Sequence, residues 1–378
     1  VISDTGSFFQ CSFVKALETW FGDDHEYDAT MALIAEGKDL RNEFGYITDY
    51  VRDYNKLEIL MLEALMEKFR KMCTGIGIRP YRWQGPGNLV SAVFNKHKIP
   101  RNEHIQLETR FPGLRQYANN GYYGGRFEAC QIGDITGPIH QYDINSAYAA
   151  TYATLPCMVH TTWNKQTTIP ADGCYISDVS FEHPDGLFVN TLPVRTVKGS
   201  IVFPRFGRGT YFSPELQLAK SMGVKLTIHS AWVAIRHCDC SYFDWVPDMY
   251  VERKRIGKSG QGIVLKITLA TIYGKLCQSV GSASWANPVW AGLITSTVRG
   301  QLAQAALANG DGHDVVMLAT DGLFCRESRS LPVSKDIGEW DHEVHSDMFV
   351  IQSGVYVLPH EKIKTRGVPH AKVKAGVE

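Results

Sequence analysis

The chain has 378 residues, enough to bury a large hydrophobic core, and this length favours two or three structural units over one. Hydrophobic residues make up 44% and charged residues 21%, close to the globular average, and no apolar stretch is long enough to span a bilayer. We therefore expect no membrane partner. The formal net charge of zero argues against indiscriminate binding to nucleic acid.

Positive charge is concentrated downstream of an acidic beginning. Residues 1–60 contain 12 Asp and Glu against 5 Lys and Arg, whereas residues 252–275 contain six basic residues and one acidic residue. Such a run is usually a solvated face. Its position beside a predicted helix, and between two candidate carboxylates described below, favours phosphate binding instead.

The nine cysteines run from Cys11 to Cys325 without any CxxC pair. The segment His237-Cys238-Asp239-Cys240 admits a metal cluster, but CxC without a second cluster is more typical of reduced, buried thiols, so we expect no structural zinc site. The odd count, and an N-terminus (VISDTGSFFQ) without a secretory signal, indicate a reducing cytoplasm. A start further upstream stays open.

In chain order, the first clear element is a long helix over 50–73, where apolar residues recur at helical spacing before the breakers Gly75, Gly77 and Pro80. A Gly-Pro-rich passage then leads into a second, short helix. The next break, at 110–128, is a glycine-rich loop that exposes backbone beside adjacent tyrosines. A loop of this kind could lie against a strand of nucleic acid.

A β-rich section follows as far as about residue 235. The helical pattern returns at 245–275 and again at 296–310, where Gly310 ends it, and 314–325 predicts two short strands joined by a tight Asp-Gly turn. Because strands and helices alternate irregularly, we expect an α+β fold. The strand-like pieces of the β-rich section are 139–144, 173–181, 200–204 and 225–235.

Two aspartates stand where metal ions could be held. Asp143 ends an apolar strand just before the helix-start residues Asn145 and Ser146, and Asp321 lies at the tip of the predicted hairpin. Carboxylates on neighbouring strands could hold two Mg²⁺ ions. One ion would activate an attacking 3′-hydroxyl, and the other would neutralise a triphosphate and its leaving group. Each residue also has an ordinary alternative, with Asp143 as a helix cap and Asp321 as a turn residue.

The helix between the two aspartates favours the functional interpretation. In LKITLATIYGK, helical spacing groups Lys266, Tyr273 and Gly274, which offer a cation for a triphosphate, a ring for a base pair and bare backbone for close approach. The preceding ERKR segment adds Arg253 and Lys254 as candidate triphosphate contacts.

Together these passages resemble family B DNA polymerases, in particular the phage, viral and linear-plasmid group that includes protein-primed enzymes, over nearly the whole chain. DINSAYA resembles the first palm motif, DxxSLYP. The resemblance implies that Asp143 and the backbone of Ile144 bind metal, and that the ring of Tyr148 blocks a ribose 2′-hydroxyl. Ala147 and Ala149 replace the motif's Leu and Pro.

Two further motifs complete the resemblance. KITLATIYGK resembles the finger motif KxxxNSxYG, which implies the nucleotide contacts by Lys266 and Tyr273, although Ala270 and Thr271 replace Asn and Ser. ATDG resembles DTDS, which implies that Asp321 is a metal ligand, with Ala319 in place of a supporting Asp.

Shorter matches imply contacts with DNA. GYYGGRFE resembles the YxGG loop that contacts template, SGVY resembles the KxY motif that supports the primer terminus, and KTRG resembles the segment leading into the thumb. The implied DNA contacts are Tyr122, Gly124, Gly125, Tyr356, Lys364 and Arg366.

The first hundred residues resemble the C-terminal part of a 3′–5′ exonuclease domain. YNKLEILMLEAL fits the YxxxD motif through Tyr54, with Glu58 where Asp is usual, although an amphipathic helix with surface charge explains it almost as well. No DxE motif precedes it, so we expect no exonuclease activity from this chain alone.

The resemblance implies a right-hand polymerase with an antiparallel palm sheet, short helical fingers and a stub of thumb. It also implies two Mg²⁺ ions, for which Mn²⁺ can substitute, and DNA primer-template and dNTP as partners, in the host cytoplasm if the protein is viral. A terminal protein primer stays open. The expected parts are 1–110 (partial exonuclease and linker), 111–245 (palm with an insertion), 246–283 (fingers), 284–360 (palm) and 361–378 (start of thumb).

Two other functions remain as alternatives. The replacements at Ala319 and Ala270 fit a degenerate module that binds primer and template without synthesis. An RNA-templated polymerase would use the same two-metal logic but usually has adjacent aspartates at the hairpin, where this chain has one. The stretch between Tyr273 and Asp321 is short for the insertion that gives protein-primed phage polymerases their strand displacement. The resemblance therefore implies weak strand displacement.

Overall fold

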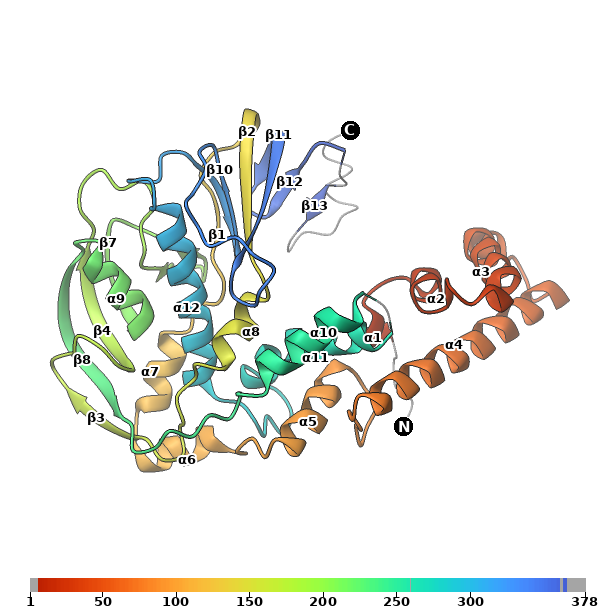
Figure 1. The fold of residues 1–378 in the computed structure, drawn as a ribbon, viewed down its shortest axis with the longest axis horizontal. Helices are drawn as coiled ribbons and strands as arrows, with labels where there is room; N and C mark the ends of the chain where they lie inside the picture. Colours follow the sequence, from red (N-terminus) through yellow and green to blue (C-terminus); the bar gives the residue numbers. More distant parts are fainter. Residues whose placement is uncertain (1–5, 259, 361–362, 366–378) are drawn as a thin grey trace. The chain divides into compact units, whose positions relative to one another are not determined.

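The computed structural model describes residues 6–258, 260–360 and 363–365, and the chain divides into two compact units (Figure 1). Unit 1 comprises Val1–Ile99 and Trp245–Lys275, and unit 2 comprises Pro100–Asp244 and Leu276–Glu378. Each unit is therefore built from two separate stretches of chain. The five-part division expected from the sequence stays a prediction.

The described part of unit 1 consists of helices and loops. Its longest helix is α4, where the side chain of Thr48 accepts a hydrogen bond from the Val51 amide and so caps the first turn. This helix confirms the long helix predicted at 50–73. The helices are α1 (Gly6–Phe9), α2 (Phe13–Phe21), α3 (Asp28–Leu40), α4 (Asp49–Gly75), α5 (Pro86–Lys96), α10 (Val246–Ile256) and α11 (Gln261–Leu276), with 3-10 turns η1 (His25–Tyr27) and η2 (Arg41–Glu43).

The core of unit 1 joins its two stretches of chain. Leu65 and Phe69 of α4 share one buried cluster with Val264 and Leu265 of α11. The ring of His97 also stacks on Trp245, with 4.4 Å between ring centroids. The helical pattern predicted at 245–275 is confirmed as α10 and α11, and both helices belong to the same unit as α4.

Unit 2 is organised around an antiparallel sheet with the strand order β1-β9-β10-β2-β11-β12-β13. The predicted hairpin at 314–325 is confirmed as β9 and β10, which pair with each other, and β10 also pairs with β2. The strands are β1 (Phe127–Ala129), β2 (Gly133–Ile144), β9 (Val315–Ala319), β10 (Gly322–Cys325), β11 (Trp340–Gln352), β12 (Val355–Val357) and β13 (Lys364–Thr365).

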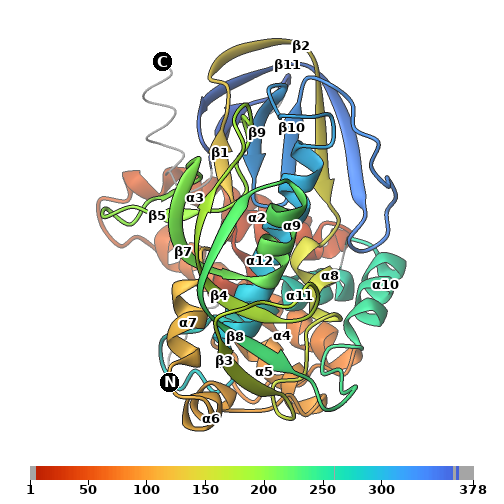
Figure 2. The ribbon, with the colours of Figure 1, turned by 90° about the vertical axis from the view of Figure 1, so that its left-hand side faces the viewer.

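The helix α12 (Pro288–Ala306) covers one face of this sheet and contacts β7 of a second sheet as well as β10 (Figures 1 and 2). It begins eight residues before the predicted 296–310 because Asn287 caps it and Pro288 follows. Nearly all of its sides are buried, so its first half shows no amphipathic pattern that a sequence reading could detect. It also ends at Ala306, before Gly310.

The second sheet of unit 2 has the order β3-β8-β4-β7 and packs on α9 around a core that includes Tyr175, Tyr211 and Leu216. The remaining elements are α6 (Glu103–Arg110), α7 (Leu114–Asn120), α8 (Ala147–Tyr152), β3 (Thr162–Gln166), β4 (Tyr175–Glu182), β5 (Val194–Arg195), β6 (Ile201–Val202), β7 (Phe206–Phe212), α9 (Ser213–Ser221) and β8 (Lys225–Ile235). The expected α+β fold is confirmed. Among the described helices, none has the length and apolarity to cross a membrane.

Candidate active site

The structure brings the two predicted aspartates side by side in the large sheet. Asp143, near the end of β2, pairs in register with Gly322, the first residue of β10. The Ile144 amide donates a hydrogen bond of 3.0 Å to the carbonyl oxygen of Asp321. The end of the central strand and the tip of the hairpin are therefore joined directly through their backbones.

The turn that carries Asp321 is unusually tight. Thr320 has a positive φ of 62°, and the Asp321 amide donates to the carbonyl of Ala319 at 2.8 Å. A Cβ atom at Gly322 would lie 2.7 Å from Oδ1 of Asp143, closer than real Cβ contacts. Glycine at this position therefore leaves room for the Asp143 carboxylate beside the turn.

Asp143 lies on the face of the sheet that is turned away from α12. Side chains alternate along a strand, and its neighbours Tyr142 and Ile144 belong to the core cluster that contains α12 residues. The side chain of Gln141 shares the face of Asp143 and donates a hydrogen bond to its Oδ2. This contact orients one carboxylate oxygen and leaves Oδ1 next to Gly322.

A third acid, Asp341, was not identified from the sequence. It pairs in register with Asp143 across β2 and β11, which puts both side chains on the same face. Lys335 bonds both carboxylate oxygens of Asp341, at 2.5 and 2.6 Å. Side chains alternate between the two faces of a strand, so Asp341 could have been assigned to one face, but the partner strand was not predictable from the sequence.

Tyr148 lies in the first turn of α8, close to the Asp321 turn. Burial raises the pKa of Tyr148 to about 12, and the Asp321 carboxylate acts in the same direction. A Cβ on Gly125 would lie 3.3 Å from the Tyr148 hydroxyl and 2.9 Å from Cγ2 of Thr320. The glycine loop, the tyrosine and the hairpin tip therefore meet at one place.

A buried ion pair holds the glycine loop, which is the segment 121–126 between α7 and β1. Arg299 of α12 and Glu215 of α9 form two hydrogen bonds of 2.8 Å, with side chains only 2% and 1% exposed. Arg299 also donates to the carbonyl of Gly124, and Arg195 donates to the carbonyl of Tyr122 at 3.0 Å. Arg299 and Glu215 could not be identified as a pair from the sequence, because the helices that carry them are far apart along the chain.

A cavity of about 460 Å³ opens beside Asp143. It brings three candidate residues together, since Asp143, Tyr356 and Lys364 all contribute to its wall. Tyr356 is buried and packs on Phe324, with 5.2 Å between ring centroids. Arg366, the remaining candidate of this group, lies outside the described residues. The lining residues are Gln141, Asp143, Ala319, Phe324, Glu343, Tyr356, Leu358, Ile363, Lys364 and Thr365.

The candidate nucleotide contacts on α10 and α11 lie in unit 1. On α11, Lys266 and Gly274 are exposed and Tyr273 is half-buried, as expected for one solvent-facing side of a helix whose other side enters the core. On α10, Arg253 and Lys254 lie near the ring of Tyr250, at 5.7 and 5.9 Å from its centroid. Of the three cations, Lys254 and Lys266 are exposed and Arg253 is half-buried.

The proposed exonuclease remnant has structural contacts within unit 1. Tyr54 is 4% exposed and lies so close to Gly37 that a Cβ there would be 2.2 Å from the ring. Glu58 forms an ion pair with Lys38. Burial, followed by the neighbouring Glu58, raises the pKa of Tyr54 to about 12.

The donor set at the sheet fits a divalent metal of the magnesium type. The carboxylates of Asp143 and Asp321 and the backbone carbonyl of Ile144 are hard oxygen donors, which Mg²⁺ prefers. Because Gly322 has no Cβ, Oδ1 of Asp143, one of these oxygens, can lie beside the turn.

A family model, DNA polymerase type B, organellar and viral, matches residues 24–282, and the chain belongs to this family. The primer-independent DNA polymerase PolB of Escherichia coli is 28% identical over 287 residues. That alignment covers 67% of this chain and 32% of PolB, so the chain spans about a third of the length of this relative.

Solved structures of phi29 DNA polymerase share the fold. An orthorhombic crystal form gives a TM-score of 0.66 at 17% identity and covers 88% of this chain and 68% of the phage chain. A ternary complex with primer-template DNA and incoming nucleotides gives a TM-score of 0.68 at 17% identity, covering 99% of this chain and 74% of that chain. The polymerase-type fold inferred from the sequence is thereby confirmed.

Proposed function

We propose that this chain is the polymerising part of a template-directed DNA polymerase that adds deoxynucleotides to a primer 3′-hydroxyl. The observation that carries the proposal is the junction of Asp143 with the Asp321 turn, where the Ile144 amide bonds the Asp321 carbonyl. A strand end and a hairpin tip in one antiparallel sheet hold two carboxylates rigidly. The family to which the chain belongs supports the same activity.

Asp143, Asp321 and the carbonyl of Ile144 would hold two Mg²⁺ ions, which Mn²⁺ could replace. When bound, the ions supply activation of the 3′-hydroxyl and neutralisation of charge on the triphosphate. Gln141 orients the Asp143 carboxylate through its hydrogen bond. The ring of Tyr148, held between Gly125 and the hairpin tip, is in our proposal the group that excludes a ribose 2′-hydroxyl.

The other candidate residues divide into nucleotide and DNA contacts. Cations on the exposed faces of α10 and α11 suit the triphosphate, since charged hydrogen bonds to phosphate are strong. Tyr273 and Gly274 would meet the base pair. The nucleotide contacts are Arg253, Lys254, Lys266, Tyr273 and Gly274, and the DNA contacts are Tyr122, Gly124, Gly125, Tyr356, Lys364 and Arg366.

Primer extension tests the proposal. The chain is given a DNA primer-template, the four dNTPs and Mg²⁺, alongside Asp143→Asn, Asp321→Asn and, as a matched control, Asp134→Asn on the exposed side of β2. We expect the first two variants to lose extension and the control to keep it. Extension that persists in both site variants would reject the assignment.

Sugar selection is tested separately with Tyr148→Val. Removing the ring opens the space beside Gly125, so we expect ribonucleotide incorporation to rise while deoxynucleotide incorporation changes little. Incorporation ratios of single nucleotides measure the effect. An unchanged ratio would remove Tyr148 from this role.

Separate reactions test how synthesis by this chain is primed. The E. coli relative is named a primer-independent polymerase, so reactions without a primer belong beside those with an oligonucleotide or a terminal protein. We propose that the chain serves replication of a phage, virus or plasmid. The template should be DNA, and an RNA template is included as the contrasting case.

A degenerate module that binds DNA without synthesis is the second candidate. It is favoured by Ala319, which is buried in β9 and lines the cavity beside Asp143 where the family motif has an acid. Binding of primer-template that is unaffected by Asp143→Asn, with no extension in Mg²⁺ or Mn²⁺, would support it.

A further inference from the structure

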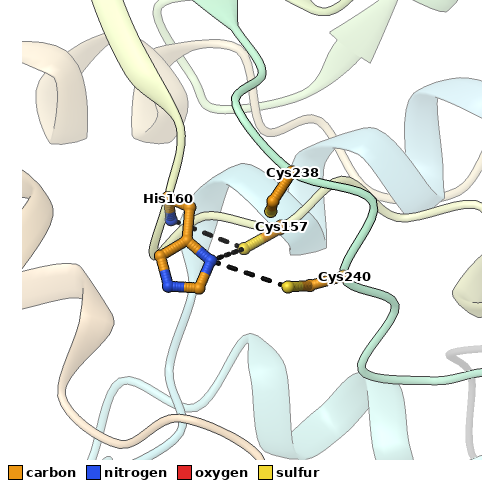
Figure 3. A group of neighbouring side chains, drawn as sticks. All are labelled: Cys157, His160, Cys238 and Cys240. Carbon is orange, nitrogen blue, oxygen red and sulfur yellow. Dashed lines mark hydrogen bonds between the residues drawn. The ribbon is translucent and has the colours of Figure 1, made fainter.

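Four side chains with soft metal-binding donors converge in unit 2, away from Asp143 and Asp321. The ligand atoms of Cys157, His160, Cys238 and Cys240 all lie within 4.8 Å of one another (Figure 3). No other group of three or more His, Cys, Asp or Glu side chains in the described part of the chain converges in this way. The CxC spacing predicts ordinary buried thiols at Cys238 and Cys240, whereas the structure places both half-buried beside Cys157 and His160.

Strand pairing explains why these residues meet. The strand β3 begins opposite the end of the antiparallel strand β8, with Thr162 paired to Ile235. The segment before β3 must therefore lie beside the segment after β8, which brings Cys157 and His160 to Cys238 and Cys240. Neither sequence spacing, CxxH or CxC, is specific enough on its own to predict a metal site.

Two ligand-to-ligand distances at His160 agree with one tetrahedral ion. With Zn–S near 2.3 Å and Zn–N near 2.0–2.1 Å, ligand atoms at tetrahedral angles lie about 3.6 Å (S to N) and about 3.8 Å (S to S) apart. The Nδ1 atom of His160 is 3.7 Å from Sγ of Cys157 and 3.6 Å from Sγ of Cys240. Both separations are compatible with hydrogen bonds to sulfur, and both also match the S-to-N edge of a zinc tetrahedron.

Both ligand segments are held by groups outside the cluster. Arg110 donates to the carbonyls of Val159 and Thr161 at 2.8 and 2.9 Å, and the Trp290 indole donates to the carbonyl of Pro156 at 2.7 Å. The CxxH segment is thus fixed by three hydrogen bonds before any ion arrives. Such preorganisation is what a metal site requires.

The CxC segment is fixed in a similar way. The Arg236 guanidinium donates to the carbonyls of both Cys238 and Cys240. His237 points to a different partner, since its Nε2 lies 2.7 Å from Oγ1 of Thr162. All nine cysteines lie in the described part of the chain and all are free, so no disulfide competes for these thiols.

We propose that Cys157, His160, Cys238 and Cys240 bind one Zn²⁺ ion as a closed structural site. Three thiolates and one imidazole are soft donors that select zinc over Mg²⁺, and four protein ligands leave no position for a substrate. The ion would join the start of β3 to the segment that leaves β8. That segment ends at Asp244, the last residue before the chain passes into unit 1.

Metal content is measured first on the wild-type chain, purified in reductant without chelator. We expect about one zinc per chain by mass spectrometry, and after exchange with Co²⁺ we expect the absorption bands of tetrahedral cobalt with thiolate charge transfer. This measurement needs no variant and does not depend on polymerase activity. A chain that takes up neither Zn²⁺ nor Co²⁺ stoichiometrically would overturn the proposal.

Variants then locate the site. Cys238→Ser with Cys240→Ser should lose the zinc, whereas the neighbouring His237→Asn and the exposed Cys11→Ser should keep it. Circular dichroism checks folding, and if the double variant does not fold, the cobalt spectrum of the wild type decides between three sulfur ligands and fewer. Full zinc content in a folded double variant, or a Cys238–Cys240 disulfide under reducing purification, would contradict the assignment.

Discussion

Gly322 shows how a single residue can limit the proposed chemistry. A Cβ at this position would lie 2.7 Å from Oδ1 of Asp143, and this atom is the end of a side chain that can rotate. We therefore expect Gly322→Ala to leave the thermal midpoint almost unchanged. Primer extension should fall on the order of 100-fold, because small displacements of a catalytic group are costly.

Gly87→Ala is the matched control for this variant. No atom outside its helix neighbourhood lies within 4 Å of the new Cβ, and the residue is in α5 of unit 1. It should keep full extension activity. If Gly322→Ala extends primers as fast as the control does, the Asp143 carboxylate does not need its observed position.

At the residue scale, the positions of single residues in strands and turns were predictable from the sequence, but contacts between distant segments were not. Asp143 and Asp321 could be placed because a strand end and an Asp-Gly hairpin are local signals. Asp341 and the Arg299–Glu215 pair could not, since each depends on which distant segment becomes the neighbour. Local patterns do not encode those pairings.

At the scale of elements, the ion pair between Glu215 of α9 and Arg299 of α12 should contribute measurably to the free energy of unfolding. Arg299→Met leaves the Glu215 carboxylate buried without its partner, which costs about 3–5 kcal/mol in such pairs. We expect a lower midpoint in urea unfolding. Adding Glu215→Met should recover much of the loss, because no buried charge is then left unpaired.

Arg255→Met provides the comparison on an exposed pair. Arg255 and Glu252 form an ion pair in which the side chains are 69% and 43% exposed, so water already screens the interaction. This variant should unfold like the wild type. An Arg299→Met variant that behaves in the same way would show that the buried pair contributes little to the link.

Element boundaries show why the sequence predicts some helices better than others. The helix α4 has one buried and one charged side, so its periodicity is visible and its predicted span is close to Asp49–Gly75. The helix α12 is buried on nearly every side, and its start was missed although Asn287 and Pro288 form a recognisable beginning. Because tertiary contacts bury nearly every side of α12, its sequence lacks the amphipathic spacing that marks a surface helix.

At the scale of the whole molecule, we expect no proofreading by this chain. Tyr54 of the candidate exonuclease motif is packed in the core, with 4% of its surface exposed. Glu58, the candidate remnant, forms an ion pair with Lys38. A primer with a 3′ mismatch should therefore remain untrimmed in the presence of Mg²⁺, as followed on a denaturing gel.

A perfectly paired primer serves as the control for this experiment. Metal-dependent trimming of the mismatched primer that disappears in Glu58→Gln would show that the prediction is wrong. Weak strand displacement is a separate expectation, and extension through long duplex DNA without a helicase would contradict it.

The shared core of unit 1 limits how the chain can be shortened. Val264 and Leu265 of α11 are buried against Leu65 and Phe69, residues that a fragment beginning at Pro100 would lack. Such a fragment would expose this apolar surface and tend to aggregate even with its palm sheet intact. The first hundred residues therefore cover apolar surface of α11, independently of any nuclease chemistry.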